Sequence, residues 1–368
     1  MSIKTVLVTG GTGFLGAHII SQLLEKGYTV RATARSASKL QSIFPKATAE
    51  NLQIIEVPTL TSDHSAALKG VDALIHSASP IFGEGVSGQE LYSGAYEGAV
   101  TLVKQAIAAG VKKIIVTGTF ASLFNADFQA AFGTRVLTEK DFGSITPASI
   151  DLNNDGMRVY QESKTLADKA IWELAHSHPD VDFTVLLPPS IFGPQLSPLT
   201  SSISSLSTNS FIKMLFAPEY PPIPVGHLID VQDAARAHIL ALTTPPVSGR
   251  DKRFIISNGT FRWKDVAALI RSKKLELAAR LPKETSVPGP QTSAPLDTTF
   301  AKEVLGLKNY ISQEETLLAG VDVVLEWEKC QRLGSSVLGQ ASHRGNRSKR
   351  WIMQEEYVLR YLSNYQGE

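Results

Sequence analysis

Tyr160 and Lys164, in the stretch Val-Tyr-Gln-Glu-Ser-Lys-Thr (159–165), are the two residues whose spacing most directly suggests chemistry. A helix is expected near 157–177, and side chains four positions apart on a helix share one face, so both can point into one cleft. A phenol with its ordinary pKa of about 10 is a poor acid at neutral pH, but a nearby ammonium that stabilises the phenolate lowers that pKa. Such a pair can protonate a carbonyl oxygen while a hydride is added to the carbon.

The spacing of this pair is weak evidence when it stands alone. In a chain with 9 tyrosines, roughly half of one such pair is expected by chance. Its position adds weight, because the pair follows a strand-like segment that ends in Val-Thr-Gly-Thr-Phe-Ala-Ser (116–122) and offers hydroxyls at Thr117, Thr119 and Ser122. A third hydroxyl would hydrogen-bond the same carbonyl oxygen and hold it in line.

A glycine-rich segment, Thr-Gly-Gly-Thr-Gly-Phe-Leu-Gly (9–16), follows the first strand-like run and opens a helix. Gly10 permits a tight turn, Gly13 lets the backbone approach a pyrophosphate, and Gly16 allows close packing of helix and strand. The free N–H groups at the helix N-terminus favour phosphate. The segment therefore predicts dinucleotide binding, with the spacing Gly-x-x-Gly-x-x-Gly.

The end of the second strand-like run reads Ala-Thr-Ala-Arg-Ser-Ala-Ser-Lys (32–39), where an acid would otherwise hold the ribose hydroxyls of NAD. An arginine at that place favours a 2′-phosphate. Arg35, together with Lys39, is therefore expected to select NADP(H). The alternative is a solvated surface arginine.

Composition excludes several classes of partner. The chain has 36 Lys and Arg against 35 Asp and Glu, a net charge of +1, which gives no field for nucleic acid or an acidic membrane surface. A single cysteine excludes an intrachain disulfide and a thiolate zinc site, and the eight histidines form no metal-like cluster. No apolar run approaches the roughly 20 residues that span a bilayer. We expect a cytoplasmic protein without a bound metal.

Strand-like and helical patterns alternate along the first half of the chain, which predicts an α/β fold with a Rossmann-like, doubly wound parallel sheet and a smaller C-terminal substrate lobe. Strands are expected at 5–10, 29–35, 52–57, 73–78, 113–118, 183–189 and 253–258. Helices are expected near 14–26, 91–109, 157–177 and 230–242.

The domain organisation is predicted from a change in amino-acid composition after residue 187, where Ser, Thr and Pro become frequent. We expect residues 1–187 and 226–258 to form the NADP-binding core. Residues 188–225 and 259–330 should form the substrate-binding lobe, so that the two lobes interleave in sequence. The basic segment 331–368 is left unassigned.

Five segments together resemble the extended short-chain dehydrogenase/reductase superfamily, over about residues 3–330. They are the glycine-rich segment, His-Ser-Ala-Ser-Pro (76–80), the strand end 116–122, Tyr-Gln-Glu-Ser-Lys (160–164) and Pro-Pro-Ser-Ile-Phe-Gly-Pro (188–194). Within that superfamily the sequence is similar to the branch with dihydroflavonol reductases, cinnamoyl-CoA reductases and fungal aldehyde, ketone and methylglyoxal reductases.

The resemblance implies a role for each matching residue. Pyrophosphate would be bound by Gly10, Gly13, Phe14, Leu15 and Gly16, and the 2′-phosphate by Arg35 and Lys39. Ala78 would pass beneath the cofactor, and Pro188 and Ile191 would line the nicotinamide. Tyr160 would be the proton donor, while Lys164 would hold the nicotinamide ribose and lower the tyrosine pKa.

Two departures from the family pattern concern the site. The family's Thr-Ser-Ser at the strand end is Thr117-Gly118-Thr119 here, so Thr119 is expected to orient the carbonyl, with Ser122 as the alternative hydroxyl. The Asp-Leu pair that commonly touches adenine is Thr59-Leu60, which implies a different contact to adenine.

The leading hypothesis is an NADPH-dependent reductase of an aldehyde or ketone. A nucleotide-sugar epimerase or dehydratase is one alternative, although it predicts an acidic ribose site and tightly held NAD. A non-catalytic NADP-sensing module is another, although such modules have usually lost the Tyr-x-x-x-Lys pair. The specific small-molecule substrate and the choice between monomer and homodimer stay open. Six phenylalanines could line an apolar pocket or belong to the core, namely Phe82, Phe120, Phe124, Phe192, Phe211 and Phe216.

Overall fold

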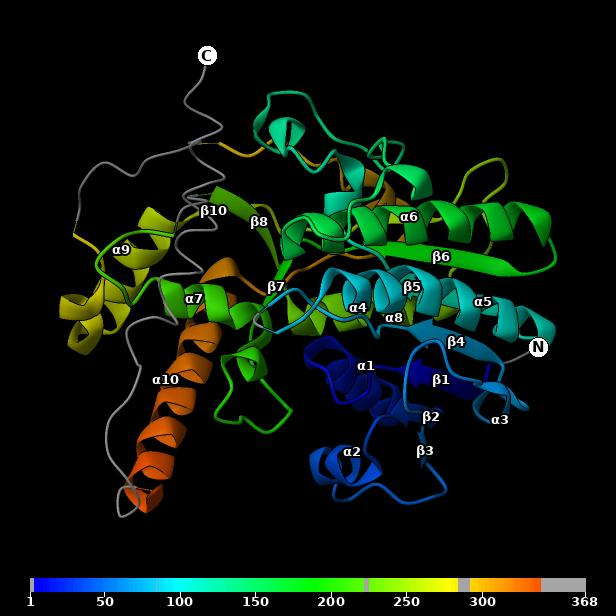
Figure 1. The fold of residues 1–368 in the computed structure, drawn as a ribbon, viewed down its shortest axis with the longest axis horizontal. Helices are drawn as coiled ribbons and strands as arrows, with labels where there is room; N and C mark the ends of the chain where they lie inside the picture. Colours follow the sequence, from blue (N-terminus) through cyan, green and yellow to red (C-terminus); the bar gives the residue numbers. More distant parts are fainter. Residues whose placement is uncertain (1–2, 84, 222–224, 284–291, 339–368) are drawn as a thin grey trace.

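A seven-stranded sheet forms the centre of the molecule (Figure 1). The computed structural model describes residues 3–83, 85–221, 225–283 and 292–338. The strands lie in the order β3-β2-β1-β4-β5-β6-β9, and every neighbouring pair is parallel. Their bounds are β1 (Thr5–Thr9), β2 (Thr29–Ala34), β3 (Leu52–Glu56), β4 (Ala73–His76), β5 (Lys113–Thr117), β6 (Asp182–Leu187) and β9 (Arg253–Ile255). The predicted doubly wound parallel sheet is confirmed.

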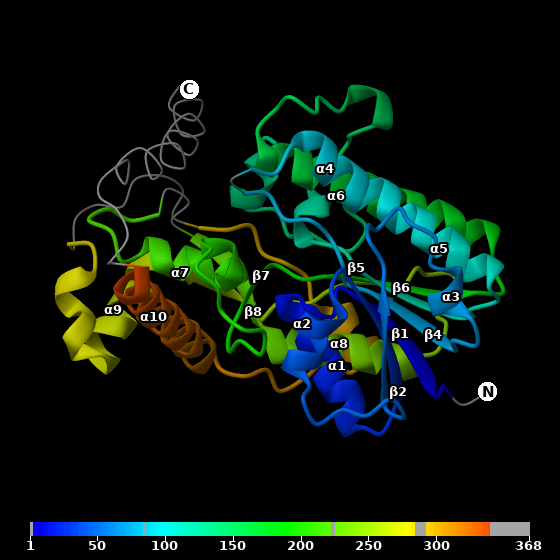
Figure 2. The same ribbon diagram turned by 60° about the horizontal axis from the view of Figure 1, so that its bottom comes forward.

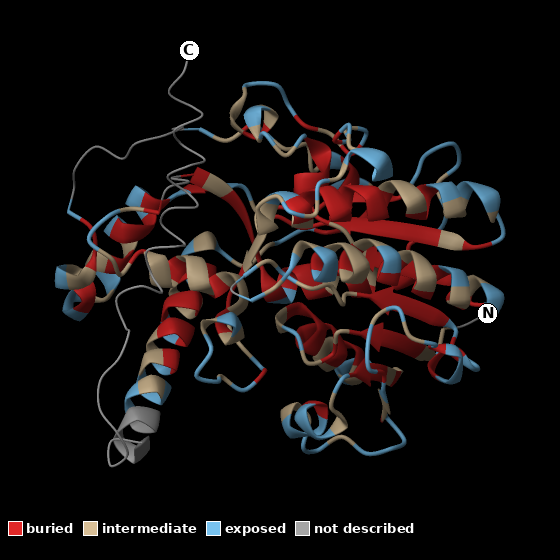
Figure 3. Cartoon of the chain, in the orientation of Figure 1, coloured by how far each residue is buried: buried red, intermediate tan, exposed pale blue. Residues whose placement is uncertain are grey.

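Helices cover both faces of this sheet, as the two views in Figures 1 and 2 agree. Helices α5 (Gly98–Ala108) and α6 (Gly156–Ser177) lie on one face, and α1 (Phe14–Glu25) and α8 (Val231–Thr243) pack together on the other. The short helices α2 (Ala37–Ile43) and α3 (Ser65–Leu68) complete the crossovers. Because both faces are covered, the central strand β1 is apolar on both sides, and Val6, Leu7 and Val8 are all fully buried. Figure 3 shows the central strands buried along most of their length.

A π-helical turn interrupts the helix that was predicted near 91–109. The helix begins three residues earlier, as α4 (Gly88–Tyr92), passes through the π-helical turn Ser93–Glu97 and continues as α5. Gly94 lies in this turn, and a Cβ atom there would come within 2.6 Å of the Pro80 ring. The turn therefore brings the helix into close contact with the chain that follows β4.

A second, smaller sheet forms the centre of the other lobe. It contains β7 (Ser190–Phe192), β8 (Val225–Asp230) and β10 (Thr260–Arg262), with β7 parallel and β10 antiparallel to β8. Helices α7 (Ser210–Met214), α9 (Trp263–Lys273) and α10 (Gln313–Leu338) surround it (Figure 1). Its core includes three aromatic rings, Phe192, Phe261 and Trp263, whose centroids lie 4.8–6.2 Å apart.

The contacts differ from the expected lobe boundaries at three places. β8 hydrogen-bonds within the small sheet, although 226–258 was expected in the core. Phe300, Leu305 and Leu307 pack with the hydrophobic core of the first lobe, although they fall in the segment 259–330 that was expected in the second. Helix α10 continues to residue 338, so the unassigned segment does not begin at 331, and residues 339–368 lie outside the described residues.

The strand expected at 253–258 returns to the core sheet as β9, where it pairs with β6. Its central residue, Phe254, is fully buried, and its ring lies 4.6 Å from the ring of Phe300. The chain thus returns to the first lobe at β9, after β7 and β8 have contributed to the sheet of the second lobe.

A substitution of Phe254 tests whether β9 packs in the main sheet. We expect Phe254→Ala to lower the free energy of unfolding by about 3–5 kcal/mol, because it leaves a cavity in a fully packed layer. Urea unfolding measures the change. As a control, Leu275→Ala, at a side chain that is 77% exposed, should change stability by no more than about 0.5 kcal/mol. An equally small effect of Phe254→Ala would contradict the placement of β9.

Candidate active site

The predicted site residues gather at the edge of the main sheet where its parallel strands end. Thr9 ends β1, His76 ends β4, Thr117 ends β5 and Leu187 ends β6, and these four strands are adjacent in the sheet. This edge faces the smaller lobe (Figure 1). Ligands of open α/β sheets bind at such an edge.

The glycine turn has the close approaches that the sequence predicts. Gly10 has a φ of +77°, and a Cβ atom on it would lie 2.9 Å from the backbone of Ala78. A Cβ atom on Gly16 would lie 2.1 Å from the carbonyl oxygen of Gly10. Gly13 precedes α1 and supplies no side-chain cap, so the first N–H groups of the helix face outward for an anion. This cradle fits a pyrophosphate.

Two contacts from the second lobe reach this turn and were not foreseen from the sequence. The Ser197 hydroxyl donates to the carbonyl oxygen of Thr12 at 3.0 Å, and the ring of His18 lies 3.0 Å from the carbonyl oxygen of Pro194. Burial lowers the pKa of His18, so its ring is neutral at pH 7. The segment after β7 is thereby fixed next to the glycine turn.

Arg35 and Lys39 are both exposed, at the end of β2 and in the first turn of α2. A carboxylate also lies there: Glu56 accepts a hydrogen bond from the N–H of Ala37 at 2.7 Å. Sequence reasoning missed Glu56 because it looked for an acid only within 32–39. The parallel pairing of β2 with β3 places Glu56 opposite Ala34. The Glu56 carboxylate is therefore fixed two residues along the chain from Arg35 and from Lys39, at Ala37.

Tyr160 and Lys164 lie on helix α6, whose first turn is capped by Asp155, a side chain that accepts from the N–H of Arg158 at 2.7 Å. Lys164 is buried, and its ammonium donates to the carbonyl oxygen of Thr117 at 2.7 Å. Burial lowers the pKa of Lys164 to about 8, against a smaller opposing effect of a nearby carboxylate. The side chain is therefore still charged at neutral pH.

Burial has the opposite effect on the acid of the pair. It raises the pKa of Tyr160 to about 12, because a phenolate is poorly stabilised away from water. The Tyr160 ring packs against Phe82, with the ring centroids 5.6 Å apart. Phe82 thus contacts the predicted proton donor, whereas Phe124 and Phe192 belong to the two cores.

Thr119 follows β5 and is buried, and its Oγ1 accepts a hydrogen bond from the N–H of Ala121 at 3.2 Å. Because that contact uses a lone pair, the hydroxyl hydrogen stays available for donation to a substrate oxygen. The Ser122 hydroxyl is fully buried and lies 2.8 Å from both the Thr119 carbonyl oxygen and the Asp168 carboxylate. This difference favours Thr119 over Ser122 as the orienting hydroxyl.

Two buried histidines hold the strand ends and were given no role from the sequence. His76 Nδ1 lies 2.7 Å from Thr9 Oγ1, and His238 Nε2 lies 2.8 Å from Thr117 Oγ1. Burial, together with the nearby charge of Lys164, lowers the pKa of His76 to about 3, and burial lowers the pKa of His238 to about 4. Both rings are neutral at pH 7 and leave Lys164 as the positive charge at this edge.

Pro188 and Ile191 lie where β6 passes into β7. Pro188 is buried, and its carbonyl oxygen accepts from the N–H of Phe120 at 3.0 Å, next to Thr119. Ile191 is half-buried within β7. Their contact with a nicotinamide stays a prediction.

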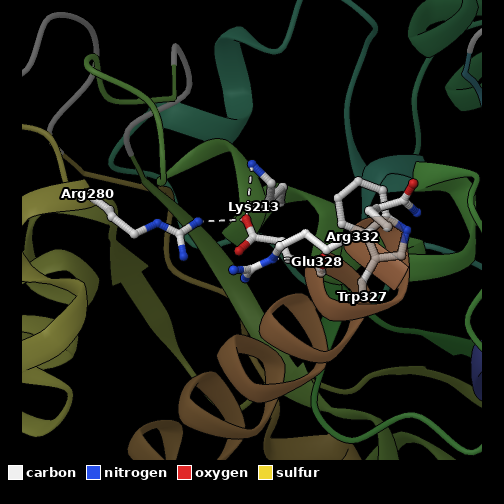
Figure 4. A pocket seen from close by; sticks show the side chains of 6 residues that line it. Lys213, Arg280, Trp327, Glu328 and Arg332 are labelled. Atoms are coloured by element: carbon white, nitrogen blue, oxygen red, sulfur yellow. Dashed lines mark hydrogen bonds and ion pairs between the residues drawn. The ribbon is translucent and has the colours of Figure 1, made fainter. Parts of the chain in front are cut away.

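A separate depression of about 510 Å³ lies in the small lobe, among α7, α10 and the turn after α9 (Figure 4). The Glu328 carboxylate lies in it, 2.6 Å from the Arg280 guanidinium and 3.6 Å from the Lys213 ammonium. None of the residues that line it belongs to the predicted site. The one carboxylate thus pairs with two of the cations that line the depression, and we give it no catalytic assignment.

Across the described ranges, no helix combines the length and apolarity needed to cross a bilayer. Within the same ranges, no group of three or more His, Cys, Asp or Glu side chains is arranged to hold a metal ion.

Gly16 tests the cradle directly. We expect Gly16→Ala to weaken binding of NADPH about ten- to a hundredfold, because relieving an overpacked contact costs about 1–3 kcal/mol. Titration by nucleotide fluorescence measures the affinity. Gly133→Ala, whose added Cβ would have its nearest neighbour at 3.7 Å, should leave the affinity unchanged. Equal affinities of the two variants would exclude the glycine turn as the pyrophosphate site.

Comparison with known proteins agrees with this geometry. An oxidoreductase of Schizosaccharomyces pombe, named as uncharacterized, is 30% identical over 342 residues, which cover 90% of this chain and 99% of that protein. The NADPH-dependent methylglyoxal reductase of Saccharomyces cerevisiae is 27% identical, covering 88% of this chain and 99% of that protein. The crystal structure of a yeast methylglyoxal/isovaleraldehyde reductase complexed with NADPH superimposes with a TM-score of 0.78 at 24% identity, covering 89% of this chain and 99% of that one.

A family model described as the NAD dependent epimerase/dehydratase family matches residues 6–257. The match spans the glycine turn, the Tyr160–Lys164 pair and the return strand β9. It also confirms the resemblance to extended short-chain dehydrogenases/reductases. The chain belongs to the NAD dependent epimerase/dehydratase family.

Proposed function

We propose that the chain is an NADPH-dependent reductase that converts the carbonyl group of an aldehyde or ketone into an alcohol. The observation that carries the proposal is a buried, charged lysine on the same helix face as a half-buried tyrosine, at the sheet edge where the Thr119 hydroxyl is available to donate. The similarity to a NADPH-dependent methylglyoxal reductase supports both the reaction and the cofactor.

The cofactor would be held by the turn of Gly10, Gly13 and Gly16, with Phe14 and Leu15 supplying the first N–H groups of α1. Arg35 and Lys39 would bind the 2′-phosphate. When bound, NADPH supplies the hydride that is added to the carbonyl carbon.

The chain's own residues would manage the developing charge on the carbonyl oxygen. Thr119 would donate a hydrogen bond to that oxygen, and Tyr160 would give it a proton. At a pKa of about 12 the phenol alone is a weak acid, and the Lys164 ammonium favours the phenolate that remains after proton transfer. Lys164 uses one of its three N–H donors on Thr117, which leaves two for the nicotinamide ribose.

Glu56 supports a second candidate, a nucleotide-sugar epimerase or dehydratase. A carboxylate at this position can accept hydrogen bonds from the adenosine ribose, which is the arrangement that favours NAD. Such an enzyme would keep NAD bound through purification. Identification of the nucleotide released on denaturation separates the two candidates, since tightly held NAD would favour the second.

The partner of the proposed reductase is a small carbonyl compound, and neither nucleic acid nor a membrane is needed for this chemistry. A cytoplasmic location is proposed from the near-neutral charge and the single cysteine. The proposal applies equally to a monomer and a homodimer.

Tyr160→Phe tests the proton donor. We expect kcat to fall about 10²–10⁴-fold while NADPH affinity is retained, because only the general acid is removed. The decay of NADPH absorbance with aldehydes, α-dicarbonyls and β-ketoesters measures turnover. The control is Tyr310→Phe, since burial also raises the pKa of Tyr310 to about 12, but this phenol lies near Asp233 and Arg236 on α8. Undiminished turnover of Tyr160→Phe would exclude the mechanism.

The preference for NADPH over NADH tests the roles of Arg35 and Glu56, whose opposite charges should change that preference in opposite directions. The wild type should prefer NADPH to NADH, and Arg35→Ala should reduce that preference about 10- to 100-fold, since a charge-assisted contact contributes about 1.5–3 kcal/mol. Glu56→Gln should raise the preference, because it removes a like charge beside the 2′-phosphate. Ratios of kcat/KM for the two cofactors give the answer, with Lys46→Ala as the exposed control. A preference insensitive to Arg35 would show that another group selects the cofactor.

A further inference from the structure

Arg253, the first residue of β9, is the largest side chain that the fold buries completely. All five of its N–H donors are used. Nε and Nη2 donate to one oxygen of Asp168 at 3.0 and 2.7 Å, and Nη2 also donates to Ser122 Oγ at 2.9 Å. Nη1 donates to the carbonyl oxygens of Glu139 and Asp141 at 2.6 and 2.7 Å.

This guanidinium connects β9 with three other parts of the first lobe. Asp168 lies on α6, one helical turn after Lys164, and Ser122 lies in the short turn after Thr119. Glu139 and Asp141 lie in the long connection before α6, and the guanidinium also stacks on the Phe142 ring at 3.7 Å. The catalytic helix and the strand-end turn therefore share one buried anchor.

The hydrogen bonds of Arg253 and Asp168 extend through Ser122 to the backbone of Thr119, a predicted catalytic residue. Ser122 Oγ, held between Arg253 and Asp168, lies 2.8 Å from the carbonyl oxygen of Thr119. That contact fixes the peptide group that follows the Thr119 side chain. The single Ser122 hydroxyl hydrogen can go either to Asp168 or to the Thr119 carbonyl oxygen, and the Ser122 N–H also donates to that carbonyl oxygen at 3.1 Å. The Thr119 backbone is thus linked through Ser122 to Asp168 on α6 and to Arg253.

The carboxylate of this pair also lies one helical turn from Lys164. Asp168 acts electrostatically on Lys164 from the same helix face. One Asp168 oxygen is taken by Arg253 and Ser122, while the Lys164 ammonium donates to the Thr117 carbonyl oxygen instead. Arg253 and Lys164 thus have separate acceptors, the Asp168 carboxylate and the Thr117 carbonyl oxygen, and the other Asp168 oxygen is buried without a hydrogen-bond partner.

We infer that Arg253 and Asp168, acting through Ser122, are positioning residues. They hold the Thr119 hydroxyl and the Lys164 ammonium at the positions relative to Tyr160 that the reaction needs. The inference rests on the proposed reductase function and extends it to residues that touch neither substrate nor cofactor. A purely stabilising role is a poor explanation, because buried ion pairs are often no more stabilising than apolar residues of similar volume.

A second buried ion cluster gives a matched control in the same sheet. At the opposite ends of β5 and β6, Asp182 lies 2.6 Å from Lys113 and 2.5 Å from Lys252, and Lys252 is 3% exposed. Lys252 immediately precedes Arg253, yet its hydrogen bonds go to Asp182 and the Thr244 carbonyl oxygen. This cluster contacts none of the predicted catalytic residues.

The experiment compares Ser122→Ala, Asp168→Asn and Arg253→Met with Lys252→Met. For each variant that folds by circular dichroism, kcat, the KM values for NADPH and carbonyl, and the melting temperature are measured. We expect kcat of the network variants to fall about 10- to 100-fold with the KM for NADPH nearly unchanged, because misplacement of about 1 Å can cost about 10²-fold. Lys252→Met should lose melting temperature but keep kcat within about twofold.

Two further readouts separate positioning from loss of a catalytic group. Asp168→Asn leaves both candidate hydroxyls in place, so its loss of kcat cannot come from removing one of them. The double variant of Ser122→Ala and Asp168→Asn should lose less than the product of the two single effects, since both break one chain. NADPH deuterated at the transferred position should show a larger isotope effect in Ser122→Ala than in the wild type.

The outcomes that overturn the inference are distinct from those that overturn the function. A wild type that turns over, together with Ser122→Ala and Asp168→Asn at wild-type kcat, would overturn the positioning role alone. Proportional loss of kcat and melting temperature across all variants, Lys252→Met included, would show that the network is merely structural. Absence of turnover in the wild type would overturn the proposed function, and the positioning role with it.

Discussion

Seven strands that run in one direction place all their carboxyl ends at one edge of the sheet, and every predicted site residue depends on that constraint. The glycine turn follows β1, Ala78 follows β4, Thr119 follows β5 and Pro188 follows β6. Helix α6 packs across the same sheet and adds Tyr160 and Lys164. Parallel pairing thus gathers groups from distant parts of the sequence at one edge.

Burial then sets the electrostatics of that edge. The same removal from water lowers the pKa of Lys164 to about 8, raises that of Tyr160 to about 12 and lowers that of His76 to about 3. At pH 7 the lysine is charged and the histidine and tyrosine are neutral. The predicted catalytic pair is thus a charged ammonium and a neutral phenol, a state that suits protonation of a carbonyl and follows from desolvation.

The sequence predicts the parts of this arrangement that are local. The strand–turn–helix of the glycine segment and the four-residue spacing of Tyr160 and Lys164 are each contained in one short stretch, and the alternation of patterns predicts the parallel sheet. Contacts set by strand register were missed. Glu56 reaches Ala37 only because β3 pairs with β2, and Arg253 reaches Asp168 only because β9 pairs with β6. β8 was not predicted as a strand, because Gly226 and His227 interrupt its apolar residues, and its pairing with β7 and β10 is a contact between distant segments.

The late position of Arg253 in the chain has a consequence for folding during synthesis. Asp168 precedes Arg253 by 85 residues, and at a translation rate of about 5–20 residues per second its partner is made roughly 4–17 s later. A carboxylate cannot be buried unpaired at little cost, so the inner face of α6 has to stay hydrated during that interval. The ion pair that links α6 to β9 therefore forms only after β9 has been synthesised.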